Sequence, residues 1–273
     1  MMYFQILDRR SKMRTASSFS GWLSIFVALL VLVACRQPST DDAASDTPLV
    51  PSVTSIEAPK KILFIGNSFT YYNGGVDRHL ERLAASTSPS IELVIESHTV
   101  PSRTLKGHYY DNATRRALSR QNWDVVVLQG ASYEPVDHTT QQEFFDFARR
   151  LNSDIKETGA QTVFFMTWAW KTRPGMSVKL RNAYVKLGNE IDALVIPVGL
   201  AWEKAQEKRS FLSLYSDSRH SNVKGTYLAA CVFYASLLGQ SPVKLPYTAG
   251  IEDGDARFLQ QVALETTKLF YNH

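Results

Sequence analysis

The sequence predicts an α/β protein, a three-layer α/β/α sandwich built around a mainly parallel sheet of about five strands. Short runs of apolar residues recur along the chain, and longer segments with apolar residues at helical spacing lie between them. Strands that are apolar throughout are buried on both faces, which is typical of a parallel sheet covered by helices. The 273 residues are also enough for one domain with a substantial core.

The N-terminal segment, residues 1–35, has the pattern of a targeting signal. Basic residues precede an apolar run from Trp22 to Val33, which is too short to span a bilayer comfortably. The run ends in Leu32-Val33-Ala34-Cys35, which resembles the lipidation box of bacterial lipoproteins. That resemblance implies a lipid on Cys35 and an extracytoplasmic protein anchored to a bacterial membrane, the outer one where there are two. An ordinary secretory signal that happens to end in a Cys is the alternative.

Residues 36–60 are expected to form a disordered tether, with the folded domain spanning 61–273. The tether is rich in Ser, Thr, Asp and Pro, a composition that buries little apolar surface. Most of the chain's net charge of +4 comes from its first 34 residues, where four basic residues stand against one acidic residue. The nearly neutral remainder gives no reason to expect a nucleic-acid partner.

Five apolar runs of strand length are expected to form the sheet. They are residues 61–66, 92–97, 124–129, 162–167 and 194–198. The clearest is the run Val125 to Leu128, which has no polar residue and therefore indicates a strand buried on both faces. Each crossover between parallel neighbours is expected to be right-handed.

Helical periodicity predicts the segments that cover this sheet. They are residues 76–86, 112–121, 140–158, 177–192, 200–208, 223–238 and 253–270. Cys231 lies in the apolar pattern of the segment 223–238, so we expect it to be a small core residue and not a nucleophile. A lipid on Cys35 would leave Cys231 without a partner for a disulfide, because the sequence contains only two Cys.

Ser68 is the first candidate for chemistry, because it follows the first strand in Gly66-Asn67-Ser68. The carboxyl ends of parallel strands are where binding sites form in open α/β sheets. A hydroxyl in that position can serve as a nucleophile once a base activates it. The alternative is that Ser68 only caps the following helix.

His220 is the candidate base, and Asp217 is the residue that would orient it. Of the six His in the chain, His220 follows a carboxylate at a spacing of three in a loop that opens a helix. This spacing lets both side chains project the same way, so Asp217 could accept a hydrogen bond from the ring nitrogen that faces away from Ser68. A surface Asp and His in a polar loop is the alternative.

Four further polar or aromatic residues follow strand ends or lie in nearby loops. Gln129 could aim its amide at a developing negative charge, or bond to loop backbone. Trp168 and Trp170 could stack on a sugar or form an acyl site, or pack under a loop. His108 could line the same pocket, or simply hydrogen-bond within its loop. The sequence shows no metal-ligand spacing and no Gly-rich phosphate loop, so we expect no metal and no cofactor.

The order of these elements resembles the SGNH (GDSL-like) hydrolase superfamily, whose fold is a flavodoxin-like sandwich. The likeness is closest to a bacterial branch with the motifs Ile-Gly-Asn-Ser-Phe-Thr, Leu-Gln-x-x-Ser, Thr-Trp-Ala and Asp-x-x-His. In this chain these motifs begin at Ile65, Leu128, Thr167 and Asp217. The resemblance covers residues 61–242.

The resemblance implies a serine esterase with Ser68 as nucleophile, His220 as base and Asp217 as its orienter. It also implies oxyanion donors at the backbone N–H of Ser68, at Ser102 and at the Gln129 side chain. Ser102 stands where the family usually has Gly, and Gln129 where it usually has Asn. These two departures concern the oxyanion hole and leave the triad intact.

Three functions are compatible with these residues. The first is an esterase that deacetylates an extracytoplasmic carbohydrate or similar ester through an acyl-enzyme, with substrate contacts at His108, Trp168 and Trp170. The second is an inactive carbohydrate-binding lipoprotein on the same fold, suggested by the altered oxyanion elements. The third is a lipase or thioesterase for longer acyl chains. The choice of a polysaccharide ester follows from the family and the aromatic residues.

Overall fold

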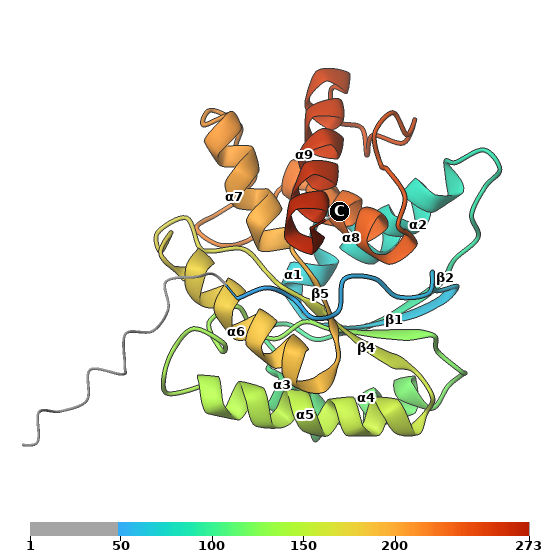
Figure 1. The fold of residues 1–273 in the computed structure, drawn as a ribbon, viewed down its shortest axis with the longest axis vertical. Coiled ribbons are helices and arrows are strands. Elements are labelled where there is room, and N and C mark those ends of the chain that lie inside the picture. Colours follow the sequence, from blue (N-terminus) through green and yellow to red (C-terminus); the bar gives the residue numbers. More distant parts are fainter. Residues whose placement is uncertain (1–48, 273) are drawn as a thin grey trace, which may run out of the picture. The chain divides into compact units, whose positions relative to one another are not determined.

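A computed structural model describes residues 49–272 and contains a five-stranded sheet (Figure 1). Its strands are β1 (Lys61–Gly66), β2 (Val94–Thr99), β3 (Val125–Leu128), β4 (Gln161–Phe165) and β5 (Leu194–Ile196). All neighbouring strands are parallel, and their order across the sheet is β2-β1-β3-β4-β5. The predicted α/β fold class is therefore confirmed. The order changes direction at β1, next to β3, which is the position where open α/β sheets form their sites.

Helices cover both faces of the sheet (Figure 1). They are α1 (Ser68–Tyr71), α2 (Val76–Ala85), α3 (Leu105–Tyr109), α4 (Asn112–Leu118), α5 (Gln141–Glu157), α6 (Met176–Ile191), α7 (Val198–Lys208), α8 (Val223–Leu238) and α9 (Asp253–Tyr271), with a short 3₁₀ turn at Tyr72–Gly74. Helices α3, α4 and α5 lie along one face, whereas α2, α8 and α9 gather over the other. The sheet is thus the middle layer of three.

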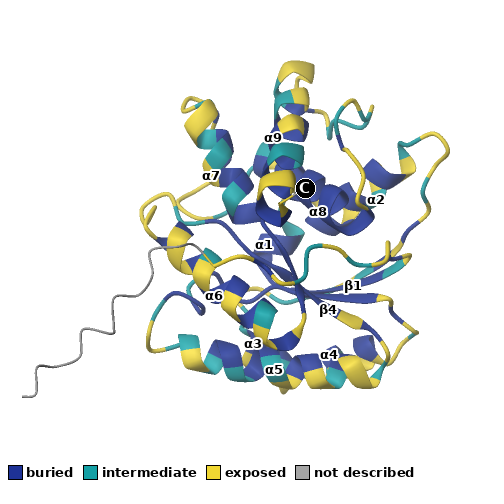
Figure 2. Ribbon diagram, in the orientation of Figure 1, coloured by how far each residue is buried: buried dark blue, intermediate teal, exposed yellow. Residues whose placement is uncertain are grey.

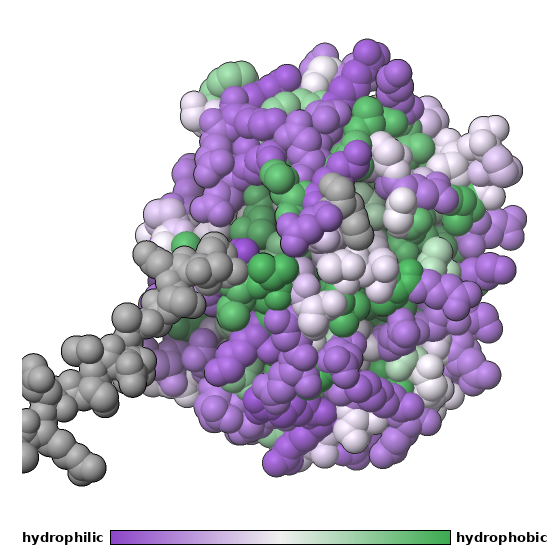
Figure 3. Space-filling model, in the orientation of Figure 1, coloured by the Kyte–Doolittle hydropathy of each residue, from purple (hydrophilic) through white to green (hydrophobic). Residues whose placement is uncertain are grey.

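The core lies where the strands meet α8. Every residue of β3 is buried, and α8 is buried on nearly its whole circumference (Figure 2). Cys231 in α8 is fully buried, and this burial raises the pKa of its thiol. Both observations fit the predicted core residue, because a buried thiol with a raised pKa is a poor nucleophile. On the face drawn in Figure 3, hydrophilic residues cover the upper and lower helices and hydrophobic residues gather between them.

The predicted elements differ from the observed ones mainly at their ends. The second strand was expected at 92–97 and lies at Val94–Thr99. Two short helices, α1 and α3, were not expected. Each is a single capped turn, started by the Asn67 side chain in α1 and the Thr104 side chain in α3. Four or five residues are too few to produce a helical period in the sequence.

The N-terminal part of the domain corrects one prediction. Residues 49–60 are predicted to belong to a disordered tether, but the structure describes them as part of the domain. Residues 49–52 lie against α6, where the Asn189 side chain accepts from Ser52 N (2.7 Å) and donates to the Val50 carbonyl (2.9 Å). Pro51 and Pro59 are buried. Hydrogen bonds between the backbone of this segment and the Asn189 side chain hold it in place, and such bonds cannot be predicted from amino-acid composition. The predicted signal, Cys35 and residues 36–48 lie outside the described residues, and no helix within 49–272 is long and apolar enough to cross a membrane.

Candidate active site

Ser68 lies at the carboxyl end of β1, as the first residue of α1. Asn67 has extended backbone angles, and its side-chain oxygen accepts a hydrogen bond from Phe69 N, which starts the helix. This cap turns the chain sharply after the strand and places Ser68 above the sheet edge. The Ser68 residue is 7% exposed, so its hydroxyl faces a confined space.

Ser68, His220 and Asp217 form one hydrogen-bonded chain. Ser68 Oγ lies 3.0 Å from His220 Nε2, and His220 Nδ1 lies 2.7 Å from Asp217 Oδ2. In this geometry the hydroxyl can donate to Nε2 while the protonated Nδ1 donates to the carboxylate. The structure therefore brings together all three residues that the sequence singled out. It is the arrangement in which a His can take a proton from a Ser and share the resulting charge with an Asp.

Asp217 is held in its charged form. Partial burial disfavours the charged carboxylate. The backbone N–H groups of His220 and Arg219, each 2.7 Å from Oδ1, and the His220 ring stabilise the charge by more than burial destabilises it. These donors lower the pKa of Asp217 to about 2. The carboxylate therefore stays ionised at neutral pH, and its side chain is 52% exposed to solvent.

Neighbouring aromatic and polar groups fix the loop that carries the base. The Tyr72 ring lies 4.3 Å from the His220 ring, and Trp168 Nε1 donates to the Arg219 carbonyl (2.9 Å). Asn73 Nδ2 donates to the Ser221 carbonyl at 2.8 Å. The His220 side chain is only 12% exposed as a result. A base held this firmly needs little reorganisation before proton transfer.

Ser102 lies in the same pocket as Ser68, in the turn after β2. Its φ of +56° is in the left-handed region that favours glycine, which matches its place where the resembling family has Gly. The turn is tied to the nucleophile, because Asn67 Nδ2 donates to the carbonyl of the next residue, Arg103 (3.0 Å). Ser102 thus retains the backbone shape of a glycine turn and can offer its N–H.

Gln129 does not reach the pocket, contrary to the sequence-based prediction. Its Oε1 accepts from Asn67 N (2.8 Å) and Thr70 Oγ1 (3.0 Å), and its Nε2 donates to Asn67 Oδ1 (2.9 Å) and the Gly130 carbonyl (2.5 Å). The residue is fully buried and all of its amide groups are used. Gln129 therefore clamps the turn that carries Ser68, and does not provide an oxyanion donor. The extra methylene relative to Asn lets the amide reach this turn from β3.

His108 is also removed from the pocket. It is fully buried behind β1, where Nε2 donates to the Gly66 carbonyl (2.9 Å) and Nδ1 accepts from Thr114 Oγ1 (3.2 Å). Burial lowers the pKa of His108 to about 4, so the ring is neutral at physiological pH. Its predicted role in substrate binding is wrong, because both ring nitrogens are bonded within the protein.

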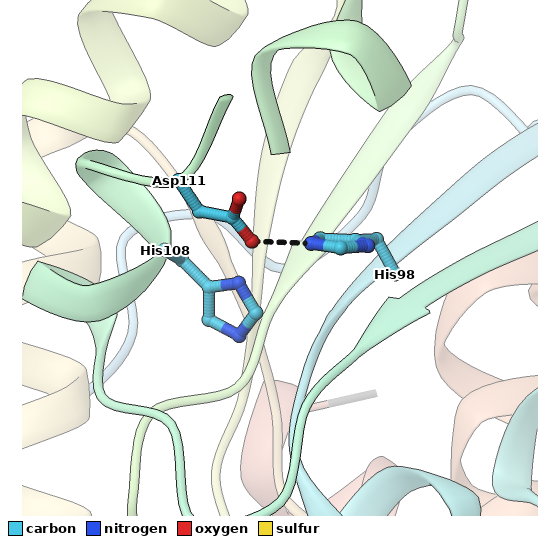
Figure 4. Close-up of side chains that lie close together, drawn as sticks. All are labelled: His98, His108 and Asp111. Carbon is cyan, nitrogen blue, oxygen red and sulfur yellow. Dashed lines mark hydrogen bonds and ion pairs between the residues drawn. The ribbon is translucent and has the colours of Figure 1, made fainter. Parts of the chain in front are cut away.

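His98, His108 and Asp111 form a cluster that sequence spacing did not reveal (Figure 4). Each offers one metal-ligating atom, and these atoms lie within 4.8 Å of one another. Asp111 Oδ2 is nevertheless 2.9 Å from His98 Nε2 and 2.5 Å from Arg103 Nη1. A fixed guanidinium already occupies the position beside the carboxylate where a cation would bind. We infer that the cluster supports the Ser102 turn, because Asp111 binds both His98 and Arg103, and Arg103 follows Ser102 in the chain. We call this arrangement the Asp111 brace.

Trp168 and Trp170, predicted to contact substrate, have different positions. Trp168 is fully buried, stacked on Trp202 with ring centroids 4.0 Å apart and planes 9° apart. It packs under the His220 loop and contacts no ligand space. Trp170 is partly exposed, lines the Ser68 pocket and donates from Nε1 to Ser132 Oγ (2.8 Å). Only Trp170 retains its predicted place.

Glu134 was missed by the sequence analysis, although it lies close to the site. The carboxylate is 2% exposed and accepts from Ala131 N at 2.5 Å, with Leu105 N as a second donor. Burial raises the pKa of Glu134 to about 7. It joins the loop after β3 to the start of α3, which lie on two sides of the pocket. A lone Glu in a Tyr-Glu-Pro turn carries no motif that would have identified it.

The pocket around Ser68 has a volume of about 40 Å³. Its walls are Asn67, Phe69, Ser102, the loop Ala131–Tyr133, Trp170, Arg219 and His220. Sites for drug-sized ligands occupy about 300–1,000 Å³, so this pocket is small by comparison. An arrangement of activated hydroxyl, base and small pocket can carry out acyl transfer.

Comparison with known proteins shows which solved structures share this fold. The chain matches no protein-family model and no curated protein. Among solved structures it is similar to a DUF4886 family protein from Bacteroides uniformis, with 19% identity over 76% of this chain and 93% of that one and a TM-score of 0.63. It is similar to a putative SGNH hydrolase from Slackia heliotrinireducens, with 23% identity, 65% and 98% coverage and a TM-score of 0.55.

Enzymes acting on acetylated xylan are also among the similar structures. An acetylxylan esterase from Geobacillus stearothermophilus has 15% identity, with 72% of this chain and 99% of that one covered and a TM-score of 0.52. Identities this low carry the fold but not the substrate. The expected resemblance in fold is confirmed, and the described part of the chain has the fold of the SGNH (GDSL-like) hydrolases.

Proposed function

We propose that this protein is a serine esterase that removes small acyl groups, chiefly acetyl, from a carbohydrate or similar alcohol. The observation that carries the proposal is the chain of hydrogen bonds from Ser68 through His220 to Asp217. The similar structures include hydrolases of ester bonds, which supports a hydrolase in general. No metal or cofactor is needed for this chemistry.

We propose the following reaction for this arrangement of Ser68, His220 and Asp217. Ser68 Oγ attacks the ester carbonyl carbon while His220 Nε2 takes the hydroxyl proton. The carbonyl oxygen gains negative charge, which the backbone N–H groups of Ser68 and Ser102 would stabilise. The C–O bond to the alcohol then breaks, and His220 returns its proton to the leaving oxygen. A water molecule, deprotonated by His220, cleaves the acyl-enzyme in the same way and restores Ser68.

The small pocket supports acetyl as the acyl group. A pocket of about 40 Å³ is far smaller than the roughly 300 Å³ or more of drug-sized ligand sites, which favours a short acyl group over the long chain of a lipase or thioesterase substrate. Comparing p-nitrophenyl acetate with p-nitrophenyl octanoate tests this point. We expect the ratio of kcat/KM to favour acetate by at least about 100-fold, several methylenes being worth over 1 kcal/mol each when they cannot be accommodated. Equal rates would favour a lipase.

The test of the nucleophile is the substitution Ser68→Ala. We expect it to abolish hydrolysis of p-nitrophenyl acetate and labelling by a fluorophosphonate probe, with the circular dichroism spectrum unchanged. Ser132→Ala is the matched control, since Ser132 lines the same pocket but bonds to Trp170 and should leave labelling intact. Full activity in the Ser68→Ala protein would show that the assignment is wrong.

An inactive carbohydrate-binding protein on this fold is the second candidate. It is favoured by one observation: Gln129, expected as an oxyanion donor, is fully used in clamping the Ser68 turn. An intact triad with a weakened oxyanion hole would bind glycans but would not react with the fluorophosphonate probe. Labelling of wild-type Ser68 therefore separates the two candidates.

We also propose that the protein works outside the cytoplasm, anchored by a lipid on Cys35. The sequence Leu32-Val33-Ala34-Cys35 supports this proposal. In cells, Cys35→Ala should move the protein from the membrane fraction to the soluble or unprocessed fraction and should prevent incorporation of labelled palmitate. Palmitate labelling of the Cys35→Ala protein would contradict the anchor.

A further inference from the structure

The Ser68 pocket leaves the alcohol part of the substrate without a binding place. At about 40 Å³ it is much smaller than the sites of about 300 Å³ or more that hold drug-sized ligands. Any sugar that carries the acetyl group must lie outside, against a wall of the pocket. Trp170 forms such a wall, and it separates the pocket from a second hollow.

This second hollow, here named the Trp170 hollow, has a volume of about 440 Å³. It lies between the loop Ala169–Pro174, Ser177 near the start of α6, the α7 helix and Tyr215. The size falls within the range of about 300–1,000 Å³ that small-molecule sites occupy. Trp170 lines both spaces, so the two lie next to one another on either side of this side chain.

We propose that the Trp170 hollow binds a neutral saccharide unit of the substrate, next to the ester that Ser68 attacks. The inference rests on the proposed esterase function and adds a binding site to it. A pyranose ring presents a face of C–H groups and a rim of hydroxyls. The residues around the hollow match both: the rings of Trp170 and Tyr215 are partly exposed, the buried Trp202 lies beneath them, and Glu203, Gln206 and Glu207 are polar.

The aromatic side of the hollow is held rigidly. Tyr215 Oη donates to the Ala169 carbonyl (2.7 Å), and Trp170 Nε1 donates to Ser132 Oγ (2.8 Å). Trp202 stacks on the buried Trp168. Rigid walls lower the entropy lost on binding, since little has to be ordered when the ligand arrives.

The polar side suits hydroxyl groups. Gln206 and Glu207 follow Glu203 by three and four residues in α7, so the three side chains lie on one side of the helix and all line the hollow. Glu203 is oriented by Ser177 Oγ, which donates to its Oε2 at 2.7 Å. The lining carries two carboxylates against the single cation Lys171. The guanidinium groups of Arg173 and Arg219 lie over the Trp170 ring, and Arg173 is paired with Asp137. The carboxylates on α7 therefore set the charge on the side where hydroxyls bind, which disfavours acidic saccharides such as uronates.

The hollow is also mechanically linked to the catalytic base. Trp168, which supports Trp202 at the bottom of the hollow, donates from Nε1 to the Arg219 carbonyl, one residue before His220. A saccharide that settles on this aromatic group therefore rests on the same support as the base. This connection explains how binding of the alcohol part places the ester against Ser68.

Titration calorimetry of the Ser68→Ala protein tests the inference, because this variant binds without consuming a substrate. The probe is xylotetraose, with tetragalacturonate as the acidic counterpart. We expect xylotetraose to bind, and Gln206→Ala and Glu207→Ala, each added separately, to raise its Kd at least tenfold. Lys204→Gln is the matched control on the same helix, because Lys204 pairs with Glu265 outside the hollow and should change Kd less than twofold.

Failure of this inference is separable from failure of the esterase proposal. Wild-type hydrolysis of p-nitrophenyl acetate, which contains no sugar, tests the esterase alone. Absence of xylotetraose binding, binding that neither α7 variant weakens, or tighter binding of tetragalacturonate would each overturn the saccharide site. Circular dichroism of every variant shows whether a loss of binding reflects a loss of fold. Because the two α7 substitutions are made separately, each provides an independent measurement of the effect on Kd.

Discussion

At the scale of single residues, the proposed oxyanion role of Ser102 depends on the conformation of its backbone. A left-handed φ of +56° is tolerated by Ser but strongly disfavoured for a β-branched residue. We therefore expect Ser102→Gly to retain kcat within about threefold, since the N–H stays in place. Ser102→Val should push the turn toward extended angles and lower kcat by on the order of 100-fold, the usual effect of losing one oxyanion donor. Steady-state kinetics with p-nitrophenyl acetate measures both.

Thermal unfolding of these two variants provides the control. Ser102→Gly relieves backbone strain but gains entropy in the unfolded chain, so its melting temperature should change little. An unchanged kcat in Ser102→Val would mean that the Ser102 N–H does not contact the oxyanion.

A second residue-scale prediction concerns pH and Glu134. Burial raises the pKa of Glu134 from 4.5 to about 7, and nearby Glu143 adds to the rise. Between these values the unfolded chain releases a proton that the folded chain keeps, so folding stability falls as pH rises through this window. The loss is roughly 3 kcal/mol at most, from 1.4 kcal/mol per pKa unit. Below pH 4.5 both states are protonated and the penalty is absent.

Glu134→Gln tests this assignment. The substitution removes the titration, so chemical denaturation at pH 5 and pH 7.5 should show a smaller fall in stability for the variant than for the wild type. Equal falls in both proteins would place the titrating group elsewhere.

At the scale of elements, the brace between β2 and α4 positions the Ser102 turn. Asp111 caps α4 through Oδ1, which accepts from Ala113 N, and pairs through Oδ2 with Arg103. Asp111→Asn keeps a good helix cap but loses the ion pair. We expect kcat to fall about tenfold, worth 1.4 kcal/mol, with little change in KM or melting temperature.

The matched control for this brace is Glu96→Gln. Glu96 on β2 pairs with Arg120, just after α4, at 2.7 Å, so the pair joins the same part of the fold but does not line the pocket. Its loss should leave kcat unchanged, as exposed pairs contribute little. If both substitutions reduce kcat equally, the Asp111 effect is a general loosening and not positioning of Ser102.

The turn between β1 and α1 offers another test at this scale. A Cβ on Gly66 would lie 2.6 Å from Gln129 Oε1 and 2.8 Å from Thr70 Oγ1, so the glycine leaves room for the Gln129 clamp. Gly66→Ala should displace this amide and leave buried polar groups unpaired, at a cost of about 2–3 kcal/mol. Urea denaturation measures the loss. A change in the free energy of unfolding below about 0.5 kcal/mol, the usual size for a surface substitution, would show that the Gln129 side chain can move without losing its hydrogen bonds.

At the scale of the whole molecule, the sequence predicted the architecture well because each strand and long helix carries its own period. Val125 to Leu128 could be assigned as a buried strand from composition alone, and the structure places it at the centre of the sheet. The triad was also within reach, since Ser68 follows a strand and Asp217 precedes His220 by three residues. These are local signals, which survive in a single sequence.

The remaining site residues could not be placed, because their roles depend on distances across the fold. Gln129 and an oxyanion donor look alike in sequence, and only the position of Asn67 shows where the amide bonds. Trp168 and Trp170 are two residues apart, yet one is buried under the His220 loop and the other lines the pocket. Glu134 and the brace at Asp111 have no motif, since their partners come from other elements.

The N-terminal residues of the domain give the last prediction, which concerns the stability of the whole molecule. Val50 and Ser52 are hydrogen-bonded to Asn189 of α6, and Pro51 and Pro59 are buried, so residues 49–60 belong to the fold and not to a tether. A chain that starts at Leu49 should keep the melting temperature and the esterase activity of the longer chain. A chain that starts at Lys61 should lose several degrees, because removing two or three hydrogen bonds and two buried Pro costs about 2–4 kcal/mol. Asn189→Ala should reproduce part of this loss, and equal melting temperatures for the two shortened chains would show that the segment contributes nothing.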